Sequence, residues 1–321
     1  MPDDAPVSLG AHVGQQNLEM DALRSTWRRL DGAGLDWISA WDHFYEAPPA
    51  GGTMPHFEAV ATLAALALST ERARIGCLVF YVGYRNPGQL AKAVTTIDHL
   101  SRGRFELGLG AGWHEQEAAA YGYEFPGLGQ RLDMLEEAVP LIRSLLTNER
   151  TTFEGRYFRT EDASCLPLPV QDRLPIWVGG TGERRTMRIA ARYADGWNAA
   201  YTTPSEYGRL CRVLDGWCEK EGRDPSTIRR TVNLIFLASA DAAGAARVDQ
   251  QLEAQWGELA GRVKGGAVTG LPGQVVEQVA AYVRAGAQGV NIALRAPWDD
   301  AALDAYLGEV VPAVRAEFAG R

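Results

Sequence analysis

Strand-like and helix-like segments alternate along the whole chain, and this alternation most limits how the chain can fold. Eight short apolar runs, each followed by a segment with helical periodicity, are spread over 321 residues. The expected strands are 7–12, 35–41, 74–80, 104–112, 176–180, 196–200, 231–238 and 289–294. The expected helices are 17–31, 56–70, 86–101, 129–147, one from 183, 204–221, 272–285 and 299–319.

These strands are nearly continuous apolar runs, as expected for strands that are buried on both faces. Regular alternation of strands and helices indicates a parallel sheet. Eight such units in this length predict an α/β fold, a (β/α)8 TIM barrel with insertions. A doubly wound open sheet is the alternative. We expect one domain over 1–321, with irregular insertions at about 147–175 and 240–270.

Composition excludes several classes of partner. The net charge is −8 and no basic stripe is present, so we expect no nucleic-acid partner. No apolar run reaches 18 residues, so we expect no membrane span. The four cysteines have no metal-binding spacing and indicate reduced thiols. With an acidic start that lacks the apolar core of a signal peptide, they predict a cytoplasmic protein.

The active site of such a barrel lies at the carboxyl ends of the strands. Glycines, aromatic residues and imidazoles follow these ends, among them His12, Tyr81 and Trp113, and the polar side chain of Gln15 follows the first strand. The five histidines form neither an HxH nor an HExxH motif, and few carboxylates converge at the strand ends. We therefore expect no metal site.

The strand at 35–41 ends on Asp42 and His43, within the segment "WDHF". One interpretation is an aspartate that caps a helix beside a histidine that only packs. The other is catalytic machinery, because imidazole is the side chain most often used for proton transfer near neutral pH. The residues alone leave both interpretations open.

The segment "LGLGAGW" carries Gly108, Gly110 and Gly112 at the end of the fourth strand. It is a poor match to a dinucleotide-binding motif, because no strand-ending acid follows about 20 residues later. A tight strand exit that lets a planar ligand approach closely is the better interpretation.

The segment "VGGTGERRT" places a glycine turn between the fifth strand and a helix. Backbone amides at such a helix start bind anions, so we expect a phosphate site, with an ordinary glycine-rich turn as the alternative. Arg184 and Arg185 are candidates for added positive charge. The expected phosphate-binding residues are Gly179, Gly180, Thr181 and Gly182.

Taken together, "WDHF", "SRGRFELGLGAGW", "VGGTGERRT" and "RYADGWN" resemble the bacterial luciferase-like superfamily. The similarity extends over nearly the whole chain and is greatest to the oxidoreductases that depend on coenzyme F-420, a deazaflavin. The resemblance implies a TIM barrel with the cofactor across its mouth and its phosphate on the loop at 179–182. It also implies a homodimer, because relatives are commonly dimers.

The same resemblance assigns roles to individual residues. Asp42 is expected at the polar edge of the ring, and His43 near the reactive carbon as proton donor or acceptor. A non-prolyl cis peptide at Cys77–Leu78 is expected behind the ring, with Gly110 and Gly112 close to it. Arg262, Lys264 and Arg295 are candidate partners for the acidic tail of the cofactor.

One position departs from the relatives. The sugar-phosphate dehydrogenases of this group carry a glutamate directly after the glycines of the fourth strand, where this chain has Trp113. Glu115 and Glu117 lie close by but do not align with it, so no second acid is assigned. An apolar or aromatic substrate pocket is expected instead. Its expected residues are His12, Gln15, Phe44, Tyr81 and Trp113.

The sequence therefore predicts an oxidoreductase that transfers a hydride between C5 of coenzyme F-420 and a small, largely apolar organic substrate, with His43 handling the proton. The first alternative is an FMN-dependent monooxygenase on the same barrel, in which reduced flavin reacts with oxygen at C4a. The second is a flavin-binding carrier or sensor without turnover.

Overall fold

Eight parallel strands close into a barrel within residues 7–46 and 51–319, the part of the chain that the computed structural model describes. The strands are β1 (Ser8–Val13), β2 (Trp37–Ala40), β3 (Arg74–Tyr81), β4 (Phe105–Gly110), β7 (Ile176–Gly179), β8 (Gly196–Ala200), β9 (Arg229–Ala238) and β11 (Gly289–Leu294). Pairing of β8 with β9 joins the two ends of the sheet. The predicted TIM barrel is confirmed, and the open-sheet alternative is wrong.

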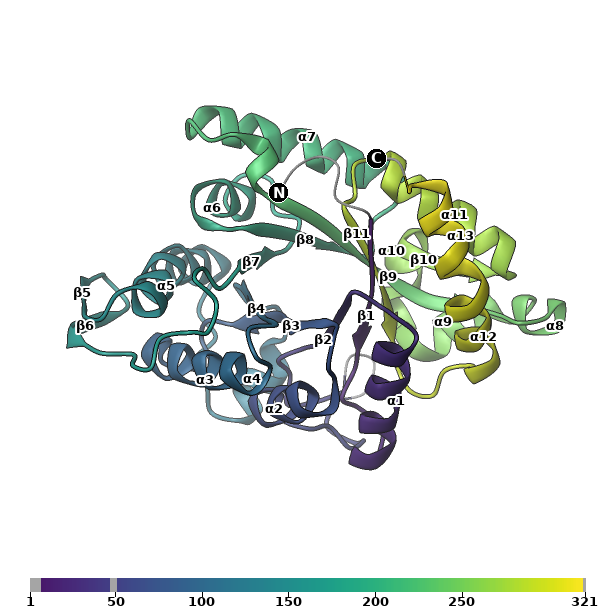
Figure 1. Cartoon of the computed structure of the whole chain (residues 1–321), viewed down its shortest axis with the longest axis horizontal. Coiled ribbons are helices and arrows are strands. Elements are labelled where there is room, and N and C mark those ends of the chain that lie inside the picture. The colour runs from purple at the N-terminus through teal and green to yellow at the C-terminus, as the bar shows by residue number, and fades with distance from the viewer. Residues whose placement is uncertain (1–6, 47–50, 320–321) are drawn as a thin grey trace.

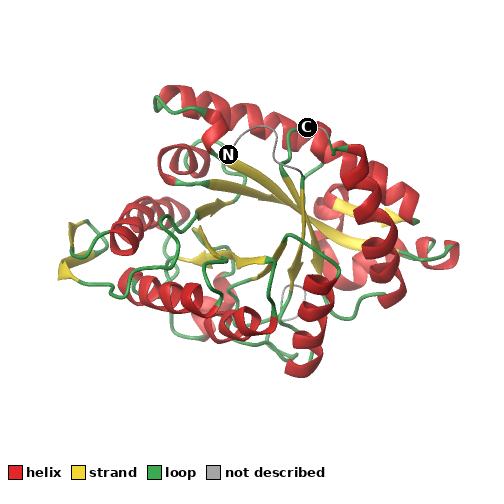
Figure 2. Ribbon diagram, viewed as in Figure 1, coloured by secondary structure: helices red, strands yellow, loops and turns green. Residues whose placement is uncertain are grey.

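Helices surround the strands on the outside of the barrel (Figures 1 and 2). The larger ones are α1 (Met20–Gly32), α2 (Ala59–Ser69), α3 (Pro87–Leu100), α5 (Leu128–Thr147), α6 (Thr186–Tyr193), α7 (Pro204–Lys220) and α11 (Pro272–Arg284). The final helical segment consists of α12 (Asp300–Ala305), a π-helical turn (Tyr306–Val310) and α13 (Val311–Glu317). Across the described residues, no helix is long and apolar enough to cross a membrane.

Side chains alternate between the two faces of each barrel strand. In β1, for example, Leu9, Ala11 and Val13 belong to the large apolar core. The opposite face is more polar: Asn233 accepts hydrogen bonds from the amides of Asn198 (3.1 Å) and Asn291 (3.0 Å), and all three are buried. The barrel interior is thus held partly by hydrogen bonds between strands.

The two insertions are more regular than the sequence indicates. The first contains an antiparallel hairpin, β5 (Thr151–Glu154) with β6 (Arg159–Ala163), which projects at one edge of the molecule (Figure 1). The second contains α8 (Ala242–Ala245), α9 (Val248–Trp256) and α10 (Ala260–Val263), followed by β10 (Ala267–Gly270), which pairs with β9. Helix α6 begins at Thr186, three residues after the expected start at 183.

Strand β3 carries a bulge beside β4. Pairing shifts between Cys77 and Phe80, because three residue steps in β3 face two in β4. The non-prolyl cis peptide lies here, at Leu78–Val79, so the expected position Cys77–Leu78 is wrong by one residue. Cys77 is fully buried in the main core, and Leu78 packs with the tryptophans of the barrel interior.

The glycines near this bulge leave room for protein atoms. A Cβ at Gly110 would lie 2.5 Å from a methyl carbon of Val79, and one at Gly179 would lie 2.7 Å from the other methyl carbon. A Cβ at Gly112, where φ is +71°, would lie 2.6 Å from the ring of Tyr81. The absence of side chains at these glycines therefore makes room for Val79 and Tyr81, and not only for the planar ligand that the sequence suggests.

Replacing Gly108 with alanine tests this packing. The added methyl group would overlap the carbonyl oxygen of Cys77, a backbone atom that cannot rotate away. We expect Gly108→Ala to lower the free energy of unfolding by about 1–3 kcal/mol in chemical denaturation. Gly216→Ala is the control, since a Cβ there meets nothing within 4 Å in helix α7, and helix propensity should raise stability slightly. Equal stability of the two variants would contradict the packing argument.

Candidate active site

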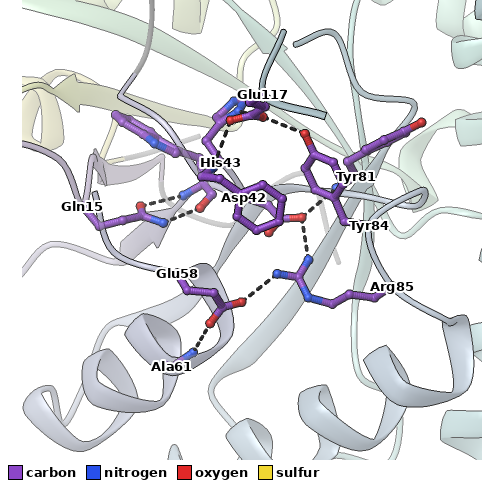
Figure 3. A network of polar contacts seen from close by, with 11 residues as sticks. Gln15, Asp42, His43, Glu58, Ala61, Tyr81, Tyr84, Arg85 and Glu117 are labelled. Carbon is purple, nitrogen blue, oxygen red and sulfur yellow. Dashed lines mark hydrogen bonds and ion pairs between the residues drawn. The ribbon is translucent and has the colours of Figure 1, made fainter. Parts of the chain in front are cut away.

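Chemically active side chains gather where β2, β3 and β4 end (Figure 3). Asp42 and His43 follow β2, Tyr84 follows β3, and Glu117 lies in α4 (Glu115–Ala120), which follows β4. The carboxyl ends of parallel strands meet at one rim, so residues far apart in sequence come together.

Asp42 is a buried carboxylate tied to the segment after β3. Its Oδ2 accepts hydrogen bonds from the Tyr81 amide (3.1 Å) and from Arg85 Nη1 (2.7 Å). Arg85 also donates to Glu58 (2.7 Å), the N-cap of α2. Burial raises the pKa of Asp42 above its ordinary value, although Arg85 favours the charged form. Its Oδ1 is buried and has no hydrogen-bond partner within the described residues.

His43 contacts a carboxylate. Its Nδ1 lies 2.6 Å from Glu117 Oε1. The Glu117 carboxylate also accepts the backbone amides of Phe44 (2.9 Å) and Tyr45 (3.2 Å) and the hydroxyl of Tyr84 (2.9 Å). Figure 3 shows His43 and Tyr84 both directed at Glu117. Glu117 is almost fully buried, so its negative charge is stabilised by these hydrogen-bond donors instead of by water.

The environment keeps Glu117 ionised. Burial by itself would raise its pKa, but the hydrogen bonds from His43, Phe44 and Tyr84 together lower the pKa to about 2. The sequence assigns Glu117 no role, because it does not align with the acid of relatives. The signal that points to it is its place within the first turns of a helix directly after a barrel strand.

Three further histidines, His12, His56 and His114, lie near the rim, and burial lowers the pKa of each. His12 Nδ1 lies 2.8 Å from Ser39 Oγ, and Trp41 Nε1 donates to His56 Nε2 at 3.0 Å. Burial lowers the pKa of His12 to about 3, of His56 to about 4, and also that of His114. No group of three or more metal-ligating side chains suited to a metal ion occurs among the residues that the structure describes.

Other predicted pocket residues are packed by protein. Gln15 is buried, and its amide bonds both the carbonyl (2.5 Å) and the N–H (3.3 Å) of Trp41. Its polar atoms thus hold the backbone after β2. Phe44 packs against the rings of Tyr84 and Tyr123. The sequence predicts both Gln15 and Phe44 in a substrate pocket, and the structure gives each of them a packing or anchoring contact.

Trp113 is the most exposed large aromatic side chain at this rim among the predicted pocket residues. Its side chain is 55% exposed, stacks on His114 with ring centroids 4.8 Å apart, and meets His43 edge-on at 5.1 Å. Tyr81 has a buried hydroxyl without a hydrogen-bond partner in the described chain. The structure therefore brings His43, Trp113 and Tyr81 to the same rim as Asp42.

The loop after β7 is open and mostly exposed. Gly180 has φ +121° and donates its amide to Asn198 O (3.1 Å), while Trp197 Nε1 donates to the Gly180 carbonyl (2.8 Å). The amides of Thr181 and Gly182 have no protein acceptor within residues 7–46 and 51–319. They are thus available to an anion.

Three of the cations predicted to contact the cofactor have protein partners. Arg185 pairs with Asp133 (2.5 Å) and Glu136 (3.5 Å), so its charge is partly balanced by two acids. Arg295 is buried, with its guanidinium 3.5 Å from the ring centre of Trp256. Lys264 pairs with Asp249 (2.6 Å).

A small pocket in the barrel lies apart from this rim. Its lining includes Ser8, Trp37 and Arg229, which are the first residues of β1, β2 and β9. It is therefore at the amino-terminal end of the barrel, and neither Asp42 nor His43 lines it. We place the candidate site at the carboxyl rim, where the polar side chains converge.

Comparison with known proteins gives consistent matches. The family described as luciferase-like monooxygenase matches residues 5–262. An F420-dependent glucose-6-phosphate dehydrogenase of Intrasporangium calvum is 31% identical over 319 residues, covering 89% of this chain and 92% of that protein. An F420-dependent hydroxymycolic acid dehydrogenase of Mycobacterium tuberculosis is 30% identical over 251 residues, covering 77% and 68%.

Solved structures agree on the fold. An F420-dependent secondary alcohol dehydrogenase in complex with an F420-acetone adduct superposes with a TM-score of 0.85 at 19% identity, covering 97% of this chain and 99% of that one. The long-chain alkane monooxygenase LadA superposes with a TM-score of 0.81 at 15% identity, covering 98% and 92%. At these identities the likeness concerns the fold alone.

The buried histidines predict how stability depends on pH. In the unfolded chain His12 and His56 take up protons near pH 6.5, whereas in the folded chain they stay neutral until about pH 3 and 4. The folded state then binds fewer protons, so the free energy of unfolding should fall as pH drops below 6.5. We expect His12→Asn to reduce this slope by up to about 1.4 kcal/mol per pH unit. Denaturation curves at pH 7, 6 and 5 measure it, and unchanged slopes would contradict the argument.

Proposed function

Because this chain belongs to the luciferase-like monooxygenase family, we propose that it is an oxidoreductase that uses coenzyme F-420 and acts on small organic molecules. The observation that carries the proposal is the 31% identity, over 89% of the chain, to an F420-dependent dehydrogenase. The rim with Asp42 and His43 at the end of β2 supports it, since a hydride-transferring cofactor needs a proton-transfer group beside it.

The described residues fit a deazaflavin. A buried carboxylate oxygen without a partner, Asp42 Oδ1, is suited to accept a hydrogen bond from the polar edge of the ring. The available amides of Thr181 and Gly182 are suited to the phosphate, with Gly179 and Gly180 shaping the turn. When bound, the cofactor gives or takes a hydride at C5.

In this proposal His43 moves the proton that accompanies the hydride. Its side chain is 15% exposed, so it is open to the rim while Glu117 holds its Nδ1 from within. The bulge at Leu78 and Val79, beside Cys77, would form the floor under the ring of a bound cofactor, with Gly110 and Gly112 next to it. Arg295, stacked on Trp256, forms part of the wall after β11.

The substrate side is largely aromatic. Trp113 presents an exposed face next to His43, and the neutral imidazole of His12 adds one polar group. Such a surface suits an apolar or planar molecule better than a phosphorylated sugar. A homodimer in the cytoplasm remains part of the proposal, on the ground of family resemblance.

Replacing His43 tests the proton-transfer role. We expect His43→Ala to lower turnover by roughly 10²–10⁴-fold, the usual contribution of a general acid or base. Affinity for the cofactor should change little, as measured by fluorescence titration. His99→Ala, an exposed position on α3, serves as the control with unchanged turnover. Full activity of His43→Ala would remove His43 from the mechanism.

Cofactor identity and the phosphate site are tested together by titration. We expect the protein to bind coenzyme F-420, and Thr181→Glu to weaken binding at least tenfold, because the new carboxylate repels the phosphate. Thr26→Glu adds the same charge on α1 and should leave affinity unchanged. Tight FMN binding with oxygen uptake would favour the monooxygenase alternative, and binding without conversion of any alcohol, enone or imine would favour a carrier.

A further inference from the structure

We propose that Glu117 is a positioning residue that fixes His43 in the tautomer with its proton on Nδ1, so that Nε2 is the atom that exchanges a proton with the substrate. The inference rests on the proposed function and adds a residue to it. Glu117 itself touches neither substrate nor cofactor in this proposal; it acts through His43.

The first argument concerns the proton between the two side chains. An ionised carboxylate only accepts hydrogen bonds, so the 2.6 Å contact between Nδ1 and Glu117 Oε1 requires the hydrogen to be on Nδ1. In the neutral ring Nε2 then carries the lone pair. When a substrate O–H bond breaks, its proton can pass to this lone pair, and the positive ring is stabilised by the adjacent carboxylate.

The second argument concerns what holds Glu117 in place. Besides His43 it receives the hydroxyl of Tyr84 and the amides of Phe44 and Tyr45. Phe44 and Tyr45 follow His43 directly in the chain, so the carboxylate binds both the ring and the backbone beside it. This arrangement opposes rotation of the imidazole, because a flipped ring would leave a buried carboxylate lacking its donor.

The third argument concerns competing groups around His43. His114 and Trp113 contact the ring without a hydrogen bond to it, at centroid distances of 5.7 Å and 5.1 Å. Asp42 is directed to Arg85 and the Tyr81 amide. The other titratable groups that interact electrostatically with the residues around His43 and Glu117 are His12, His56 and Glu46. Among these described groups, only Glu117 hydrogen-bonds the His43 ring.

The tautomer is measurable without any cofactor. Nitrogen-15 NMR of the histidine rings in the cofactor-free protein should show His43 protonated at Nδ1, with assignment by comparison with His43→Ala. In Glu117→Gln the Nδ1 preference should weaken, because the neutral amide accepts a hydrogen bond less strongly than a carboxylate. A wild-type His43 protonated mainly at Nε2 would overturn the proposal, even if Glu117→Gln does not fold.

The matched pair of variants is Glu117→Gln and Glu115→Gln, two residues apart on α4, where Glu115 is exposed. We expect Glu117→Gln to lower kcat by about 10²–10³-fold with KM and cofactor affinity within threefold, and Glu115→Gln to match wild type. Glu117→Asp should recover part of kcat. Tyr84→Phe, which removes one of four donors, should cost less than tenfold.

The outcomes separate this inference from the proposed function. Full kcat in Glu117→Gln, with His43→Ala impaired, would overturn the positioning role and leave the function intact. A loss of kcat with an unchanged tautomer would also overturn it, since the effect would then be structural. An active His43→Ala would overturn the proton-transfer role itself. Loss of kcat together with a mixed tautomer supports the proposal.

Discussion

Closure of the barrel by pairing of β8 with β9 is the constraint on which the other features depend. Because all eight strands run parallel, their carboxyl ends meet at one rim. This brings His43 next to Glu117, 74 residues later in the chain. The floor beneath the rim depends on the same closure, since Val79 of the β3 bulge fits only because β4 and β7 present glycines to it. Chain topology and side-chain size together shape this end of the barrel.

Two buried carboxylates at this rim have different electrostatic states, and their partners explain the difference. Asp42 has an arginine and one amide on a single oxygen, which leaves the other oxygen without a partner in the described chain and its pKa raised by burial. Glu117 receives four donors that together outweigh the burial, so its pKa falls to about 2. Asp42 therefore keeps an oxygen that can accept a hydrogen bond from a bound molecule. The carboxylate of Glu117 is already occupied by protein donors, among them the ring of His43. Such a division of roles by environment is common among paired acids in active sites.

The sequence predicts most of the fold because each barrel strand is an apolar run bounded by polar residues, and burial on both faces requires this. It also predicts the segment Asp42–His43 at a strand end, and in the structure this segment follows β2 with only Trp41 between. It does not predict Glu117, whose importance comes from a contact across 74 residues that no local pattern encodes. The sequence does not predict the β5–β6 hairpin for a different reason. The hairpin is polar and half exposed, so it lacks the alternation of apolar and polar residues that is typical of a strand. The cis peptide lies one residue beyond the expected position, within the bulge of β3 against β4, and no local sequence pattern marks that position.

The relatives' glutamate is replaced by Trp113 in this chain, and the arrangement of side chains at the rim shows what the replacement changes. A tryptophan there brings an apolar face to the rim and lies edge-on to His43, 5.1 Å between ring centres. An acid one turn further along, Glu117 in α4, reaches the imidazole of His43 from the buried side instead of from the exposed side where Trp113 lies. In the proposed function, the charge that would assist His43 is therefore kept out of the substrate pocket, which would stay aromatic. Under the proposed function, this arrangement would separate proton transfer by His43, assisted by a buried ion, from substrate contact, which would use an apolar surface.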